Sequence, residues 1–282
     1  MPTHKTTPLI VITNDDGITS PGLLAAVQAV MPLGELLVAA PDRQWSGAGR
    51  SMPPGPKGHI SRYPLEVGGR LVTAYQVDAS PALAVMHALL ELAPRRPALL
   101  ISGINYGENL GTDVTISGTV GAALQAADHG IPALAASLQT PKETHTNPSD
   151  SVDFTAAIHF TRLFAHRLLA TPLPFDVDLL KLDVPSDATP ETPWRLTRVS
   201  RHTYFIPSLA DPEAPLLVGR TERDGRELDY TPLAHPERTE PDSDIYALAV
   251  DRVVSIAPLS LDLTPRADLG EVEALLRGTT AL

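Results

Sequence analysis

The first two-thirds of the chain alternates between short apolar runs and longer stretches whose apolar residues recur every three or four positions. Continuous apolar runs at 9–13, 36–39 and 98–102 are typical of strands buried on both faces, and further strands are expected at 71–77, 132–137 and 177–184. The helical spacing falls between these runs. Strands that alternate with helices predict a mostly parallel sheet covered by helices on both faces, so we expect a Rossmann-like α/β fold.

Capping residues indicate where the helices begin and end. Helices are expected at 21–31, from 81 onward, at 119–129 and over 154–168. Ser20-Pro21 and Ser80-Pro81 each place a preferred N-cap residue before a proline, which favours the first helical position. Gly130 is expected to close the third helix, and Asp150 or Ser151 to cap the fourth.

After Pro185 the alternation ends, which predicts an α/β core at 1–185 and an extension at 186–282. Residues 185–194 are expected to be a linker, followed by short strands at 196–199 and at about 251–258. Residues 207–244 are acidic and proline-rich, and they predict extended arms and turns. Apolar runs at 216–218 and 245–248 need burial, which an arm exchanged within a symmetric dimer would provide. The alternative is a surface loop folded back on its own domain.

Composition excludes several classes of protein. Lys and Arg number 22 against 33 Asp and Glu, a net charge of −11, which argues against nucleic-acid and membrane-surface binding. The absence of cysteine excludes disulfides, thiolate metal sites and a cysteine nucleophile. No apolar stretch is long enough for a membrane span or a signal peptide, so we expect a soluble, cytoplasmic protein.

Polar residues follow directly after two of the expected strands. Asn14-Asp15-Asp16-Gly17 comes after the first, and ligands of open parallel sheets bind beyond the carboxyl ends of strands. A divalent cation would hold both carboxylates ionised, whereas the alternative is an acidic turn that caps the next helix. In the loop 41–51, Gly47 and Gly49 would let backbone N–H groups approach an anion, or the glycine- and serine-containing loop would simply be flexible.

The most informative segment is 102–121. Ser117-Gly118-Thr119 opens the alanine-rich helix, where unpaired N–H groups and the helix dipole favour a phosphate. Asn105 and Asn109 add neutral oxygen donors that suit a hard cation. The Walker pattern G-x-x-x-x-G-K-[ST] is missing. A glycine-rich helix cap alone would not explain why two asparagines, a serine and a threonine gather here.

Four motifs in this order, TNDDG, APDRQWSGAG, SGINYGENLG and SGTVGAALQAA, resemble the stationary-phase survival protein E (SurE) family. The similarity is strong over 9–137, with fainter similarity at 182–185, 243–244 and 254–259. The resemblance implies a metal-dependent phosphatase that acts on nucleoside 5′- or 3′-monophosphates, with a side activity on short polyphosphate. It also implies homodimers or homotetramers formed through C-terminal arms.

The resemblance further implies a role for each matching position. One divalent ion per subunit, Mg²⁺ or Mn²⁺, would be bound by Asp15, Asp16, Ser46 and Asn105. The substrate phosphate would be surrounded by Asn14, Gly47, Asn109, Ser117, Gly118 and Thr119. The base and sugar are expected near 45–56 and 106–113.

These residues suit in-line attack on phosphorus by a metal-activated water, with Asp15, Asp16 and Asn105 as catalytic residues. Direct attack by Asp15 or Asp16 is an alternative, although the Asp-x-Asp arrangement of aspartyl-phosphate enzymes is missing. The histidines, including His87 and His129, are expected on the surface or on helices. A different class of function is a non-catalytic metal- or phosphate-binding module of the receiver type, which would need an aspartate after its third strand and a lysine after its fifth.

Overall fold

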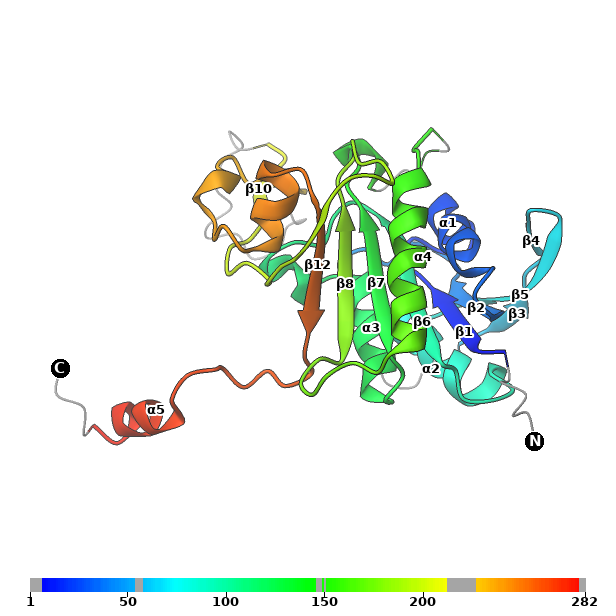
Figure 1. Cartoon of the computed structure of the whole chain (residues 1–282), viewed down its shortest axis with the longest axis horizontal. Coiled ribbons are helices and arrows are strands. Elements are labelled where there is room, and N and C mark those ends of the chain that lie inside the picture. The colour runs from blue at the N-terminus through cyan, green and yellow to red at the C-terminus, as the bar shows by residue number, and fades with distance from the viewer. Residues whose placement is uncertain (1–6, 54–57, 146–148, 150, 212–226, 279–282) are drawn as a thin grey trace, which may run out of the picture.

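The computed structural model describes residues 7–53, 58–145, 149, 151–211 and 227–278. Its centre is a ten-stranded sheet in the order β3-β5-β2-β1-β6-β7-β8-β12-β9, with β4 paired to β5 (Figure 1). The strands are β1 (Leu9–Thr13), β2 (Glu35–Pro41), β3 (Ile60–Arg62), β4 (Leu65–Val67), β5 (Arg70–Val77), β6 (Leu99–Tyr106), β7 (Ala133–Leu138), β8 (Leu179–Val184), β9 (Trp194–Leu196) and β12 (Val254–Leu259). The expected mostly parallel α/β architecture is confirmed.

The strand order reverses between β1 and β6. Strands β5, β2, β1, β6, β7 and β8 pair in parallel. The chain passes from β1 to β2 on one side and later returns to form β6 on the other side of β1. A crevice therefore opens beyond the carboxyl ends of β1 and β6, where ligands of doubly wound sheets bind.

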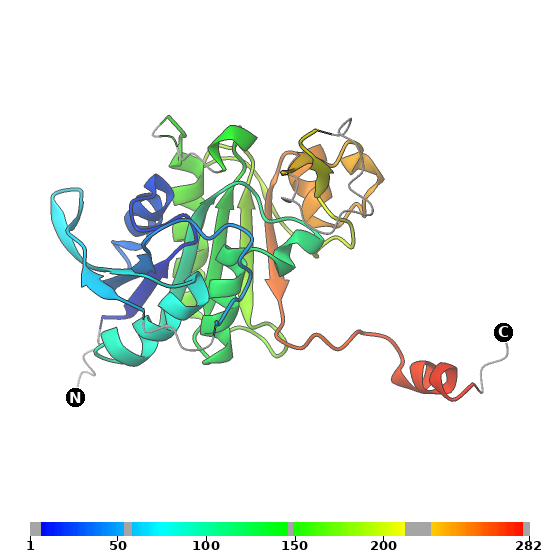
Figure 2. The same ribbon diagram turned by 180° about the vertical axis from the view of Figure 1, so that it is seen from behind.

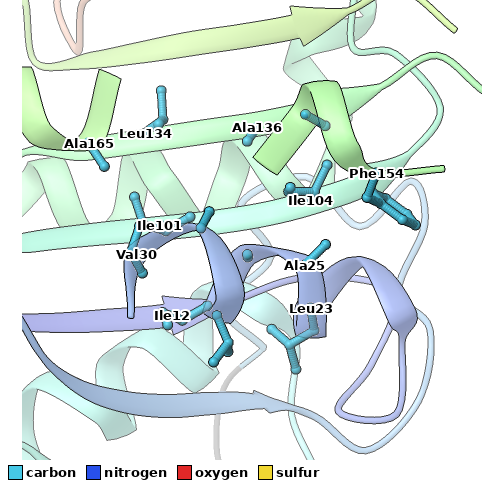
Figure 3. Close-up of a cluster of buried hydrophobic side chains, with 14 of the residues drawn as sticks. Ile12, Leu23, Ala25, Val30, Ile101, Ile104, Leu134, Ala136, Phe154 and Ala165 are labelled. Carbon is cyan, nitrogen blue, oxygen red and sulfur yellow. The ribbon is translucent and has the colours of Figure 1, made fainter. Parts of the chain in front are cut away.

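Helices cover both faces of the sheet. Helices α1 (Pro21–Val30) and α4 (Thr155–Ala170) lie on one face, and α2 (Pro81–His87) and α3 (Gly118–Asp128) lie on the other (Figures 1 and 2). Alternate residues of β1 enter the two cores: Ile10 and Ile12 pack under α1, whereas Leu9 and Val11 pack on the α2 and α3 side. Figure 3 shows side chains of β1, β6, β7, α1 and α4 that meet in the first core.

Three predicted helix starts are confirmed by side-chain caps, and one is wrong. Ser20 Oγ accepts a hydrogen bond from Gly22 N at 3.2 Å, and Ser80 Oγ accepts one from Leu83 N at 3.3 Å. Ser117 Oγ accepts one from Val120 N at 3.1 Å. The fourth helix, α4, begins at Thr155, whose N–H donates to Asp153 Oδ1 at 2.8 Å.

The cap expected at Asp150 or Ser151 is therefore wrong. Ser151 lies in a turn before α4, and residue 150 lies outside the described residues. The strand expected at 196–199 also differs, because β9 lies at Trp194–Leu196, where it pairs with β12. The returning strand expected near 251–258 is β12, at Val254–Leu259.

The described residues of the segment 207–244 pack on their own chain. β10 (Phe205–Leu209) and β11 (Leu228–Pro232) form a two-stranded antiparallel sheet, which the sequence analysis missed. Two short strands separated along the chain leave no periodic apolar signal. Residues 216–218 lie outside the described residues.

The apolar run at 245–248 needs no neighbouring subunit. Ile245 and Leu248 are fully buried and pack with Leu110 and Tyr204 of the same chain. The expectation that an exchanged arm must bury this run is therefore wrong.

The last described element, α5 (Leu269–Leu276), was not predicted. It lies apart from the sheet at the end of an extended segment (Figure 1). Its apolar side chains are exposed: Leu269, Val272, Leu275 and Leu276. None of the described helices is both long and apolar enough to cross a membrane.

Candidate functional site

A cavity of about 580 Å³ lies beyond the carboxyl ends of β1 and β6. This volume falls within the range of about 300–1,000 Å³ that is usual for small-molecule sites. Its lining comes from the turns after these strands, the start of α3, the loop after β7 and the β10–β11 hairpin. The predicted site residues among that lining are Asp15, Ser46, Gly47, Asn105, Asn109 and Ser117.

Asp15 and Asp16 are buried directly after β1 and are fixed by contacts from different segments. Asp15 Oδ1 accepts a hydrogen bond from the Thr119 hydroxyl, and Asp15 O accepts one from Trp45 N at 2.7 Å. Asp16 Oδ2 accepts one from Tyr106 N at 3.3 Å, and its Oδ1 accepts one from Gln44 Nε2 at 3.4 Å. The turn thus ties together β1, β6, α3 and the loop after β2.

The two carboxylates are electrostatically unfavourable neighbours. Burial raises the pKa of Asp15. Hydrogen bonds from Thr119 act in the opposite direction, but their effect is smaller. Burial, and then the charge of Asp15, raise the pKa of Asp16 to about 8. A divalent cation is the usual means of keeping two such groups ionised together. The cost of burying this pair is the observation that favours a metal site.

Asn105 is positioned by an irregularity in β6. The register between β6 and β7 shifts between Ser102 and Asn105. Such β-bulges are common beside functional sites. Gly103 permits the shift: its φ is +127°, and a Cβ there would lie 2.2 Å from Ala136 O. Asn105 Nδ2 donates to Gly107 O at 2.7 Å, so its Oδ1 is the amide atom left for a cation.

A cation at this site would need oxygen ligands in addition to the two carboxylates. Among the described residues, no group of three His, Asp or Glu side chains gathers as a metal site. Asp15 and Asp16 would therefore need the hydroxyl of Ser46 and the amide oxygen of Asn105. Ser46 is exposed on the cavity wall, next to Trp45, whose N–H is bonded to Asp15. Oxygen-only ligands fit a hard divalent cation such as Mg²⁺ or Mn²⁺.

Only some of the residues predicted to surround a phosphate line the cavity. Asn109 and Ser117 line the cavity, whereas Gly118 and Thr119 lie against Asp15. A Cβ on Gly118 would lie 2.7 Å from Asp15 Oδ2, so this position admits only glycine without displacing the carboxylate. Asn14 is fully buried and donates from Nδ2 to Gly17 O at 3.0 Å, which shapes the turn. Their roles toward phosphate stay predictions.

Several cavity residues were missed by the sequence analysis, among them His145, Phe205 and Tyr230. His145 lies in the loop after β7, half-buried at the wall, whereas the histidines were expected away from the site. Its place beyond a parallel strand was the one available signal. Phe205 and Tyr230 come from the hairpin and carry no local motif. Of the segments expected to hold base and sugar, Ser46, Gly47 and part of 106–113 do line the cavity.

A cluster of buried, oppositely charged side chains supports the wall of the cavity. Lys181, Asp183 and Asp244 are fully buried, and Lys181 Nζ contacts the Asp183 carboxylate and lies 3.0 Å from Asp244 Oδ2. Burial would lower the pKa of Lys181, but the two carboxylates raise it above its usual value. Asp183 Oδ1 accepts a hydrogen bond from Asn109 N at 2.8 Å, and Asp244 Oδ2 accepts one from Gly111 N at 3.1 Å. The cluster therefore holds the loop that carries Asn109.

Known proteins are similar to this chain in sequence and in fold. A family model described as "Survival protein SurE" matches residues 10–205. A curated relative from Thermococcus gammatolerans, named 5′-nucleotidase SurE, is 38% identical and the match covers 95% of this chain and 96% of the relative. A relative of the same name from Methanocella arvoryzae is 38% identical, with 95% and 97% covered. The crystal structure of the SurE protein from Aquifex aeolicus gives a TM-score of 0.73 at 27% identity, covering 95% of this chain and all of the other.

Proposed function

The chain belongs to the SurE family, and from this we propose that it hydrolyses nucleoside 5′-monophosphates to nucleoside and phosphate, using one divalent cation per subunit. The observation that carries the proposal is the pair of buried carboxylates, Asp15 and Asp16, directly after β1, where Asp15 lines a cavity at the switch point of the sheet. Relatives named 5′-nucleotidase SurE support the activity and its substrate class. Nucleoside 3′-monophosphates and short polyphosphate are proposed as slower substrates.

The cation would be held by Asp15, Asp16, Ser46 and Asn105. When bound, such an ion supplies Lewis acidity and lowers the pKa of a water molecule for attack on phosphorus. Thr119 and Gly118 keep the carboxylate of Asp15 in position, the first through its hydroxyl and the second by leaving room. Gln44 and Tyr106 N do the same for Asp16.

The phosphate would be held by Ser117, Asn109 and the N-terminus of α3. The first turn of this helix carries unpaired N–H groups and the positive end of the helix dipole, which stabilise the charge on phosphate oxygens. Asn109 Nδ2 donates to Ser137 Oγ at 2.8 Å, an arrangement that fixes the side chain before substrate arrives. Preorganised donors of this kind stabilise the transition state of phosphoryl transfer.

The alternative of a non-catalytic receiver-type module is less well supported. The cavity reaches beyond the carboxylates to an apolar wall, which suits an organic phosphomonoester better than a phosphoryl group on an aspartate. The relatives named as nucleotidases favour turnover in the same direction. Direct attack by Asp15 or Asp16 stays an alternative, although the Asp-x-Asp arrangement of aspartyl-phosphate enzymes is missing.

Phosphate release tests the proposal. The purified chain, treated with EDTA, is expected to release no phosphate from AMP, and Mn²⁺ or Mg²⁺ should restore turnover, because the cation neutralises the buried pair. The panel includes 3′-AMP, ribose 5-phosphate and tripolyphosphate. Activity that survives chelation would contradict metal dependence. A sugar phosphate or polyphosphate that is hydrolysed faster than every nucleotide would contradict the substrate class.

We also propose a homodimer or homotetramer joined through the C-terminal segment. The support is α5, whose Leu269, Val272, Leu275 and Leu276 recur at helical spacing and are exposed in one subunit. A second subunit would cover this stripe. The segment 207–244 is a poorer candidate than first expected, because β10, β11 and Asp244 pack on their own chain.

Light scattering tests the assembly. At micromolar concentration we expect a mass of at least twice the 30.1 kDa of one chain, because permanent interfaces bury more than ~2,000 Å². Removing residues 261–282, which leaves the buried Asp244 in place, should produce a monomer. A full-length chain that scatters as a monomer would refute the proposal.

A further inference from the structure

We infer that one face of the β10–β11 hairpin is the nucleoside-binding surface of this site, with the base stacked against Phe205 and flanked by Tyr230. The inference rests on the proposed function, because it assigns the organic half of the same substrate. It differs from the segments that the sequence analysis proposed for base and sugar, none of which includes the hairpin.

The register of the hairpin separates its two faces. Phe205 lies opposite Pro232, Pro207 opposite Tyr230, and Leu209 opposite Leu228. Directly opposed residues of an antiparallel pair project to the same side, and successive residues alternate. The four members of this face that line the cavity are Phe205, Pro207, Leu228 and Tyr230. Ile206, Ser208, Asp229 and Thr231 belong to the opposite face, and of these only Asp229, which pairs with Lys142, also lines the cavity.

The cavity-lining face is apolar and aromatic, unlike the rest of the site. The rings of Phe205 and Tyr230 meet edge to face, with centroids 5.1 Å apart. His145 stacks on Tyr230 at an interplanar angle of 11°, and its Nδ1 lies 2.8 Å from the Tyr230 hydroxyl. Aromatic rings and a few fixed polar groups are what purine and pyrimidine bases stack on and hydrogen-bond to.

Both strands of the hairpin are anchored to the body of the site. Asp113 Oδ2 accepts hydrogen bonds from Phe205 N at 2.8 Å and from Tyr204 N at 3.1 Å. On the other strand, Lys142 forms an ion pair with Asp229 and donates to Tyr230 O at 2.8 Å. These contacts fix the aromatic face in place before substrate binds. A preorganised surface adds affinity because binding then costs little ordering.

Two parts of the cavity lining have the chemistry that the two halves of a nucleotide require. Asp15, Asn105 and Ser117 line one part, where the phosphate is proposed to bind. Phe205, Leu228 and Tyr230 line another part of the same cavity, and Leu228 is 72% exposed although it is apolar. A phosphate ester bound at the carboxylates would therefore place its organic group against this exposed apolar surface. Covering the surface would stabilise the complex. Polyphosphate and small sugar phosphates lack a group that could use it.

The test compares AMP with ribose 5-phosphate, which shares the phosphate and sugar but lacks the base. In Phe205→Ala, the ratio of kcat/KM for AMP to that for ribose 5-phosphate should fall about 5- to 150-fold, the usual effect of losing one base–aromatic stack. Phe205→Trp should restore the ratio. Ile206→Ala, on the opposite face of the same strand, is the matched control and should leave it unchanged.

A loss that affects both substrates equally would overturn the inference, because it would show a purely structural role for the hairpin. So would an equal effect of Ile206→Ala. If the wild-type chain hydrolyses neither substrate, the proposed function fails, and adenosine binding by equilibrium dialysis then decides the inference. Adenosine binding that Phe205→Ala weakens and Ile206→Ala does not would support it, whereas no binding, or equal weakening by both, would overturn it.

Discussion

Asp15→Asn should reduce kcat for phosphate release from AMP by at least about 1,000-fold, equivalent to roughly 4 kcal/mol of transition-state stabilisation. The substitution removes one of the two carboxylates available to a cation while keeping the size of the side chain. Thr119 still has an oxygen to donate to, so the turn should remain in place. Steady-state turnover with saturating Mn²⁺ measures the effect.

Stability should move in the opposite direction from activity. Burial disfavours the charged form of Asp15, so a neutral amide should leave the metal-free protein as stable as wild type or more stable. Wild-type stability should rise with Mn²⁺, by about 2.7 kcal/mol at 100 times the dissociation constant, and this gain should be lost in Asp15→Asn. Asp128→Asn, at the exposed end of α3, is the matched control and should keep both activity and metal response. Undiminished turnover of Asp15→Asn would contradict the assignment of the metal ligands.

Lys181→Met should destabilise the fold by about 3–5 kcal/mol, because it leaves Asp183 and Asp244 buried without their cation. The expected effect follows from complete burial, since an ion pair in solvent contributes only about 0–1 kcal/mol. Urea unfolding at pH 7 measures the change. Activity should fall as well, because Asp183 and Asp244 hold the backbone of Asn109 and Gly111 at the cavity.

Arg198→Met provides the control for this prediction. Arg198 pairs with Asp242 at 2.9 Å, but both side chains are more than half exposed. Its loss should cost less than about 1 kcal/mol. Equal costs for the two substitutions would show that the buried cluster is not held together by the charge of Lys181.

The parallel core was predictable because strands such as β1, β2 and β7 are mainly apolar runs that are largely buried on both faces. The Ser-Pro caps of α1 and α2 and the Ser117 cap of α3 depend on adjacent residues, so a local reading identifies them. The start of α4 was misplaced because several residues before it can each cap a helix, and the backbone geometry at Asp153 decides between them. β10 and β11 were missed because their pairing joins segments about 20 residues apart along the chain.

The same distinction applies to the site. Asp15, Asp16, Asn105 and Ser117 occur in motifs next to strand ends or a helix start, and those motifs predicted where the residues lie; their chemical roles stay predictions. Lys181 was missed because a lysine in an apolar strand gives no sign of its partners, which lie on β8 and about 60 residues later. Phe205, Tyr230 and His145 meet only after the hairpin has folded against the loop after β7. Contacts of this kind are set by tertiary packing rather than by local sequence.

Anomalous diffraction from crystals grown with Mn²⁺ and inorganic phosphate tests the metal site most directly. We predict one strong Mn²⁺ peak per subunit, within bonding distance of the carboxylates of Asp15 and Asp16 and the oxygens of Ser46 and Asn105. The phosphate should lie between that ion and the N-terminus of α3 at Ser117. A Mn²⁺ peak elsewhere, or carboxylates at Asp15 and Asp16 that remain without metal at saturating Mn²⁺, would contradict the account.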